Sequence, residues 1–225
     1  MSVMTQSAYL GATRAAYDAV ADEYAALFAD SLAAGPLERG LLTAFAELVR
    51  TGPPGPVADL GCGPGRLTAF LSDLGLDTFG VDLSPAMIAI ARRERPDLSF
   101  DVGTMTGLGR ADGTLGGIVA WFSIIHTPPA DLPGFLAEFH RLLAPGGQLL
   151  VAFQTTDQPD GPPQSFDHKV ATAYRWPTAT AAALLRDAGF TETALLTRVP
   201  TESERFLRAF LLFSKPSFDG PPHAI

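Results

Sequence analysis

The stretch that decides the fold reads Val57-Ala58-Asp59-Leu60-Gly61-Cys62-Gly63-Pro64-Gly65-Arg66. Its mainly apolar start, 57–60, predicts a short buried strand. The three glycines that follow let the backbone turn sharply and let a ligand approach it closely. A helix is expected from Arg66 onward. A turn of this kind, at the carboxyl end of a parallel strand, is where open α/β sheets bind nucleotides.

Short apolar runs alternate with amphipathic segments along the rest of the chain. Further strands are expected at 78–82, 98–102, 118–122 and 148–154, and two later apolar runs, at 194–199 and 206–213, are expected to complete the sheet. Helices are expected at 66–73, 84–94, 131–143 and 178–188. Such alternation predicts an α/β fold of the Rossmann-like kind, with a mostly parallel sheet and helices on both faces.

Composition restricts the classes of function. Lys and Arg number 16 against 24 Asp and Glu, and a net charge of -8 lacks the positive surface that holds nucleic acid phosphates, so no nucleic acid partner is expected. No apolar run approaches the length of a membrane span or of a signal peptide, so we expect a cytoplasmic protein with no membrane partner. The single cysteine, Cys62, excludes an intramolecular disulfide, and four scattered histidines predict no metal site.

An acidic residue follows the glycine turn at the end of the next expected strand. Asp82 comes 21 residues after Gly61, where a carboxylate can accept hydrogen bonds from both hydroxyls of a ribose. Dinucleotide binders and S-adenosylmethionine binders share this pattern. A dinucleotide fingerprint would have glycine or alanine in place of Arg66, and the charge of Asp59 suits a ligand with an ammonium and a sulfonium better than one with two phosphates. S-adenosylmethionine is therefore favoured as the cofactor.

Four segments carry a resemblance to a known family. Asp59-Leu60-Gly61-Cys62-Gly63-Pro64-Gly65 resembles the first motif of the class I S-adenosylmethionine-dependent methyltransferases, in particular those that act on small molecules. Residues 80–87 resemble the acidic motif after it, 103–105 the third-strand segment that packs on the adenine, and 143–147 the turn before the fifth strand. The resemblance extends over about residues 13–214 and implies seven strands, the last one antiparallel and inserted beside the fifth.

The resemblance also implies roles for single residues. Gly61 and Gly63 would contact the methionine part of S-adenosylmethionine through backbone atoms, Asp59 would lie near its ammonium, and Asp82 would bind the ribose. Many members have an acid at the position of Met105, so here a backbone contact to the adenine would replace a carboxylate. The other implied contacts are Leu83 and Met87 flanking the adenine, Gly103, Thr104 and Met105 along its edge, and Ala120 and Trp121 beside the cofactor.

The N-terminal part is similar to the helix that covers the cofactor in small-molecule members. Tyr17 and Tyr24 are seven residues apart and share a helix face, from which their hydroxyls could reach the cofactor carboxylate or simply pack. The helices expected at 13–32 and around 37–49 lead us to divide a single domain, 1–225, into a helical lid (13–50), a cofactor-binding core (56–154), and an acceptor-side lid with the final strands (155–214). The polar stretch 155–163 is expected to be a loop, and the tail 216–225 is expected to fray.

Two histidines are candidates for the chemistry. His126 follows the fourth expected strand and His168 follows the 155–163 loop, so either could deprotonate an oxygen or nitrogen acceptor; each could equally be a histidine held in a loop or on the surface. The sequence thus predicts methyl transfer to a small molecule, more readily at oxygen or nitrogen than at carbon. The alternatives are a non-catalytic S-adenosylmethionine-binding protein and a nicotinamide-dependent oxidoreductase. The identity of the acceptor and the oligomeric state are left open.

Overall fold

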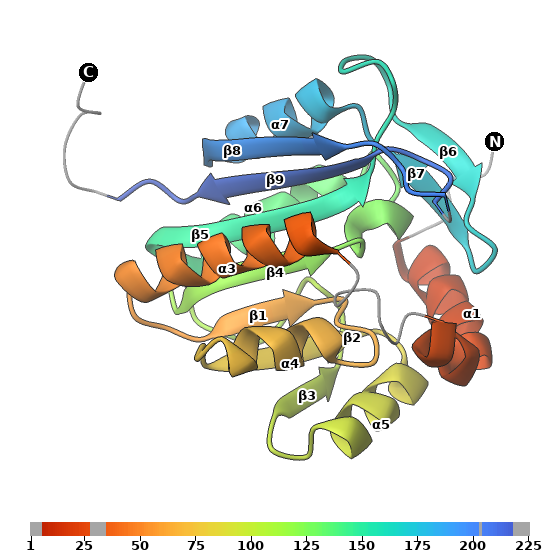
Figure 1. The fold of residues 1–225 in the computed structure, drawn as a ribbon, viewed down its shortest axis with the longest axis horizontal. Coiled ribbons are helices and arrows are strands. Elements are labelled where there is room, and N and C mark those ends of the chain that lie inside the picture. The colour runs from red at the N-terminus through yellow and green to blue at the C-terminus, as the bar shows by residue number, and fades with distance from the viewer. Residues whose placement is uncertain (1–5, 28–34, 203, 218–225) are drawn as a thin grey trace.

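A seven-stranded sheet forms the centre of the computed structural model, which describes residues 6–27, 35–202 and 204–217. Its strand order is β3-β2-β1-β4-β5-β9-β8 (Figure 1). The parallel strands are β1 (Val57–Leu60), β2 (Thr78–Asp82), β3 (Ser99–Val102), β4 (Leu115–Trp121) and β5 (Leu143–Gln154). β9 (Arg208–Ser214) lies antiparallel between β5 and β8 (Thr191–Arg198). The predicted fold class is confirmed, including the antiparallel strand beside the fifth.

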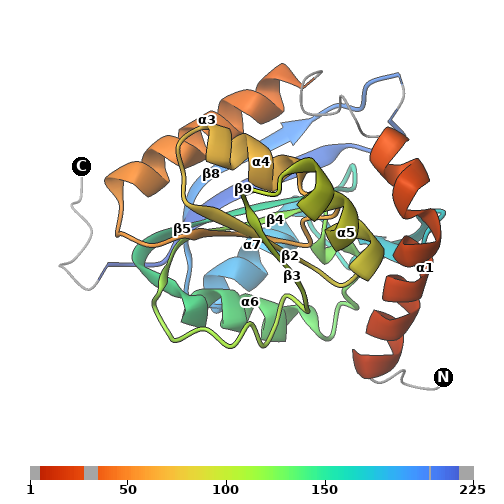
Figure 2. The same ribbon diagram turned by 90° about the horizontal axis from the view of Figure 1, so that it is seen from below.

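Helices cover both faces of this sheet. α3 (Pro36–Thr51), α4 (Arg66–Asp73) and α5 (Pro85–Glu94) lie on one face, and α6 (Leu132–Leu142) and α7 (Thr178–Asp187) on the other (Figure 2). The central strand β1 is buried along its whole length, which explains why its sequence is mainly apolar. Gly117 of β4 leaves room for Phe45 of α3, because a Cβ there would come within 2.9 Å of the phenyl ring.

Helix α1 (Gln6–Leu27) crosses the carboxyl edge of the sheet (Figures 1 and 2). Asp18 fixes it to the start of α5, since its carboxylate accepts hydrogen bonds from the Ser84 hydroxyl (2.6 Å) and the Ala86 amide (3.1 Å). The helix begins earlier than the predicted start at residue 13, and the predicted end at 28–32 lies outside the described residues. Among the described residues of the predicted 13–50 lid, those of α1 lie over this edge, whereas α3 packs on the sheet through fully buried residues such as Phe45.

The segment after β5 contains a hairpin that the pattern of residues did not predict. β6 (Gln164–Asp167) and β7 (Thr172–Arg175) pair antiparallel as a separate two-stranded sheet, after a loop over 155–163 that agrees with the prediction. Strand β5 also begins at Leu143 instead of residue 148, because Leu143 pairs with Leu115 before Gly146, at a φ of +85°, bends the chain. Most of the tail predicted to fray, from residue 218, lies outside the described residues.

No helix within the described parts of the chain is long and apolar enough to span a membrane.

Candidate functional site

The glycine turn after β1 is built as the sequence predicts. Gly61, Gly63 and Gly65 all have positive φ angles, of 77°, 53° and 81°, a conformation that is costly for other residues. A Cβ on Gly61 would lie 2.3 Å from the Cβ of Ser123, so the turn packs tightly against the segment after β4. A Cβ on Gly63 would meet nothing within 4 Å. The backbone at Gly63 therefore faces open space.

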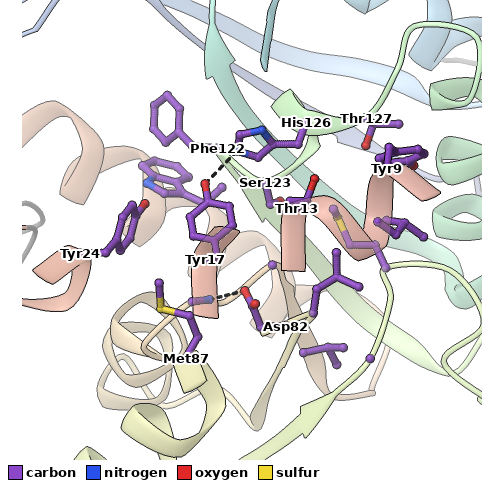
Figure 3. A pocket seen from close by; sticks show the side chains of 18 residues that line it. Tyr9, Thr13, Tyr17, Tyr24, Asp82, Met87, Phe122, Ser123, His126 and Thr127 are labelled. Atoms are coloured by element: carbon purple, nitrogen blue, oxygen red, sulfur yellow. Dashed lines mark hydrogen bonds between the residues drawn. The ribbon is translucent and has the colours of Figure 1, made fainter. Parts of the chain in front are cut away.

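That space is a cavity of about 720 Å³, counted to its open mouth, between α1 and the carboxyl ends of the central strands (Figure 3). The cavity brings together most of the predicted site residues: Tyr17, Tyr24, Gly61, Gly63, Asp82, Leu83, Met87, Gly103, Met105, Trp121 and His126.

Asp82 is held in one orientation by the backbone around it. One carboxylate oxygen accepts a hydrogen bond from the Gly63 amide and the other from the Ser84 amide, both at 2.8 Å. Each oxygen keeps a lone pair, so the carboxylate can still accept hydrogen bonds from two neighbouring hydroxyl groups. Burial raises the pKa of Asp82, while these two amide bonds oppose the rise.

His126 lies in a short 3-10 turn, Ile124–His126, directly after β4. Its Nδ1 lies 2.9 Å from the Thr172 carbonyl of β7, and because a carbonyl only accepts, Nδ1 carries the proton. Nε2 is then an acceptor, and the Tyr17 hydroxyl donates to it at 2.8 Å (Figure 3). The pKa of His126 is lowered to about 4, mainly by burial; the hydrogen bond to Thr172 opposes this shift and the nearby His168 adds to it. The ring is therefore neutral near pH 7.

His168 lies behind His126 and not on the cavity wall. The two imidazole rings are 5.0 Å apart in an edge-to-face arrangement, and the Nδ1 of His168 is buried without a hydrogen-bond partner among the described residues. Burial lowers the pKa of this histidine as well. The two predicted histidines are thus neighbours, but only His126 reaches the cavity.

Three further predicted residues do not line the cavity. Asp59 is 1% exposed, and its carboxylate accepts a hydrogen bond from the Thr68 hydroxyl at 2.7 Å instead of facing a ligand. Burial raises the pKa of Asp59 to about 7. Ala120 is fully buried in the core beneath the cavity. The hydroxyl of Thr104 donates to the Thr106 carbonyl, and Thr104 does not line the cavity, whereas its neighbours Gly103 and Met105 do.

Sequence reasoning missed several residues of the cavity wall. Helix α1 contributes Tyr9, Leu10 and Thr13 from turns that precede Tyr17, and the segment after β4 contributes Phe122, Ser123 and Thr127 beside His126; Val81 completes the set. The sequence contains a pattern that could have predicted both groups of wall residues. Thr13 and Tyr17 are four residues apart on one helix face, and 122–127 follows a strand whose carboxyl end was already assigned to the site.

No cluster of three metal-ligating side chains is found in the described ranges 6–27, 35–202 and 204–217.

The sheet order, the glycine turn and the cavity at the strand ends define the Rossmann-like methyltransferase fold. Residues 57–147 match the family model described as a methyltransferase domain. The demethylmenaquinone methyltransferase of Beutenbergia cavernae is 33% identical over 157 residues, a match that covers 60% of this chain and 65% of that protein. The chain therefore spans less than two thirds of that relative's length.

Solved structures agree in fold. The 1,6-didemethyltoxoflavin-N1-methyltransferase of Burkholderia thailandensis, crystallised with 1,6-didemethyltoxoflavin and S-adenosylhomocysteine, has a TM-score of 0.75 at 21% identity, and the alignment covers 96% of this chain and 93% of that one. The magnesium protoporphyrin IX methyltransferase of Synechocystis, with bound S-adenosylmethionine, has a TM-score of 0.70 at 16% identity and covers 96% and 100%. Residues 57–147 therefore resemble a methyltransferase domain, and the chain has the fold of the class I S-adenosylmethionine-dependent methyltransferases.

Proposed function

We propose that this protein transfers a methyl group from S-adenosylmethionine to a small-molecule acceptor. The observation that carries the proposal is the meeting of the glycine turn and Asp82 in one cavity beneath α1. The cradle fits the cofactor, because Gly63 leaves open space beside its backbone and Asp82 keeps lone pairs for two ribose hydroxyls. Leu83 and Met87 provide an apolar wall for the adenine, with Gly103 and Met105 along its edge.

The residues of the chain supply alignment and exclusion of water. S-adenosylmethionine supplies an electrophilic methyl group on its sulfonium. Helix α1 covers the cavity with Tyr9, Thr13 and Tyr17, while the segment after β4 forms the opposite wall. Holding the two reactants in line in a water-poor site can account for much of the rate of such a displacement.

The acceptor is proposed to be small, and to be methylated at oxygen or nitrogen more readily than at carbon. The relatives named above support a small molecule, since their names refer to demethylmenaquinone, 1,6-didemethyltoxoflavin and magnesium protoporphyrin IX. Thr13, Ser123 and Thr127 add hydroxyl groups to the cavity wall, and the Ser123 hydroxyl is buried with no partner among the described residues. These groups offer hydrogen bonds to a polar, uncharged acceptor.

His126 is proposed to orient the acceptor side of the site. Its Nε2 already accepts a hydrogen bond from the Tyr17 hydroxyl, and a pKa of about 4 makes the neutral ring a weak base near pH 7. General bases work best when their pKa lies near the working pH. His126 therefore orients Tyr17 and the β6–β7 hairpin, and the His168 ring packs edge-to-face on the His126 ring.

The proposal is tested by incubating the protein with methyl-labelled S-adenosylmethionine and three pools: small molecules below about 1 kDa from a cell extract, bulk RNA and duplex DNA, and bulk protein. The expected result is enzyme-dependent label in the small-molecule pool alone. Label only in a macromolecular pool contradicts the proposed acceptor class. Tight cofactor binding with no transfer to any pool supports the alternative of a non-catalytic S-adenosylmethionine-binding protein.

A further inference from the structure

Helix α1 sets the long axis of the cavity. Tyr9 and Tyr24 both line it and are 15 residues apart, so they are about 22 Å apart along the helix at 1.5 Å per residue. In the proposed function, Asp82 binds the ribose of the cofactor, and Leu83 and Met87 flank its adenine. The predicted contacts include no charged group for the carboxylate of the amino acid part. Tyr24 lies beyond Tyr17 along α1, at the C-terminal end of this axis (Figure 3).

Two arginines flank Tyr24. Arg66 begins α4 directly after the glycine turn, and its guanidinium donates to the carbonyl of Ala25, the neighbour of Tyr24. Arg208 begins β9 at the carboxyl edge of the sheet, and its guanidinium carbon lies 4.9 Å from the centre of the Phe122 ring, which lines the cavity. Both cations are close enough to lower the pKa of the Tyr24 hydroxyl, against the larger raising effect of burial.

Arg208 belongs to a network of ion pairs in which Glu204 has a second partner. Its Nη2 pairs with Glu204 at 2.8 Å. Glu204 also accepts two hydrogen bonds from Arg198, each at 2.8 Å, and Arg198 in turn pairs with Glu38 of α3. The side chain of Arg208 is 26% exposed and lies over Phe122 of the cavity wall, not on the wall itself. A guanidinium has five N–H donors, and the ion pair with Glu204 uses only part of them. Removal of Arg208 leaves Glu204 paired with Arg198.

We propose that Arg208, assisted by Arg66, makes the Tyr24 end of the cavity its positive end and orients the carboxylate of S-adenosylmethionine toward it. The inference rests on the proposed function and adds a specificity-determining residue to it. The charges along the cavity then match those of the cofactor. The Asp82 carboxylate accepts hydrogen bonds from the ribose hydroxyls, and the two arginines attract the carboxylate of S-adenosylmethionine.

The test uses two ligands that differ only in the carboxylate: S-adenosylhomocysteine and its decarboxylated analogue. Their dissociation constants are measured by calorimetry on the wild type and on Arg208→Gln. We expect Arg208→Gln to weaken S-adenosylhomocysteine by about tenfold, the order of one partly solvated charge interaction, and to leave the decarboxylated analogue within about twofold. Arg208→Lys, which keeps the charge, is expected to recover most of the loss.

The matched control is Arg205→Gln, three residues away, because Arg205 is exposed and packs on Phe206 instead of the cavity wall. It is expected to change neither constant. Equal losses for both ligands, or no loss for either, overturn the proposal. If Arg208→Gln does not fold by thermal melting, Arg66→Gln is measured with the same ligand pair and judged by the same criterion. Failure of the wild type to bind either ligand contradicts the proposed function itself.

Discussion

The tautomer of His126 shows how single residues shape the site. Nδ1 must donate to the Thr172 carbonyl, so Nε2 must accept, and the Tyr17 hydroxyl fills that position. The sequence placed Tyr17 and His126 in one site. It could not place them in contact, because they are 109 residues apart and neither segment signals the other. The same contact replaces the predicted free base with a histidine that joins α1 to β7.

The buried neutral state of His126 predicts a pH-dependent stability. The folded pKa of about 4 lies below the unfolded value of 6.5, so between pH 6.5 and pH 4 the unfolded chain binds more protons. Relative to His126→Gln, the wild type is therefore expected to be fully stabilised above pH 6.5, and to lose about 3 kcal/mol of unfolding free energy as the pH falls to 4. Urea unfolding of both proteins across this range measures the difference. A difference that does not change with pH contradicts the assigned protonation state.

At the scale of elements, the glycine turn was predicted well because its chemistry is local. Positive φ angles favour glycine whatever the rest of the chain does, and Asp82 follows the next strand at a fixed place in a βαβ unit. The hairpin β6–β7 was not predicted, since its strands have four residues each and are mainly exposed or half-buried, with little apolar alternation. The burial of Asp59 was not predicted for a similar reason: its hydrogen bond to Thr68 depends on how α4 packs on β1.

Two alanine substitutions in the turn are expected to differ in their effects on stability and on cofactor binding. Gly61→Ala forces a Cβ to 2.3 Å from Ser123, so we expect a loss of at least about 2 kcal/mol in unfolding free energy. Gly63→Ala meets no atom within 4 Å, and is expected to cost only about 1–2 kcal/mol for its φ angle while weakening cofactor binding. Denaturant unfolding and calorimetry separate the two effects. Equal stability losses in both variants would be inconsistent with this geometry.

The hold of α1 on α5 depends on Asp18. Its carboxylate accepts hydrogen bonds at the start of α5 from the Ser84 hydroxyl and the Ala86 amide, as a helix-capping residue would. Asp18→Ala is expected to cost about 1 kcal/mol and to speed amide hydrogen exchange throughout residues 6–27. Asp22→Ala, one turn further on and exposed, is the control and is expected to leave exchange unchanged. Unchanged exchange in Asp18→Ala would mean that apolar packing of Ala21 on Met87 and Ile90 suffices.

At the scale of the whole molecule, strand order decides where the chemistry lies. β1 and β4 are neighbours in the sheet although separate in sequence, so the glycine turn and the 122–127 segment meet at one edge. Alternation of strands and helices was sufficient to predict this edge, because parallel strands all present their carboxyl ends there. The position of α1 across it came from a family resemblance, since periodicity alone does not say which surface a helix covers.

The central claim is that the cavity is built for S-adenosylmethionine. The most direct measurement is a calorimetric titration of the protein with S-adenosylhomocysteine and with NAD, repeated on Asp82→Asn. We predict one site for S-adenosylhomocysteine, no binding of NAD, and a loss of about 1.5–3 kcal/mol in Asp82→Asn, the usual value of hydrogen bonds to a charged group. Binding of NAD with none of S-adenosylhomocysteine, or an unchanged affinity in a folded Asp82→Asn variant, would contradict the account.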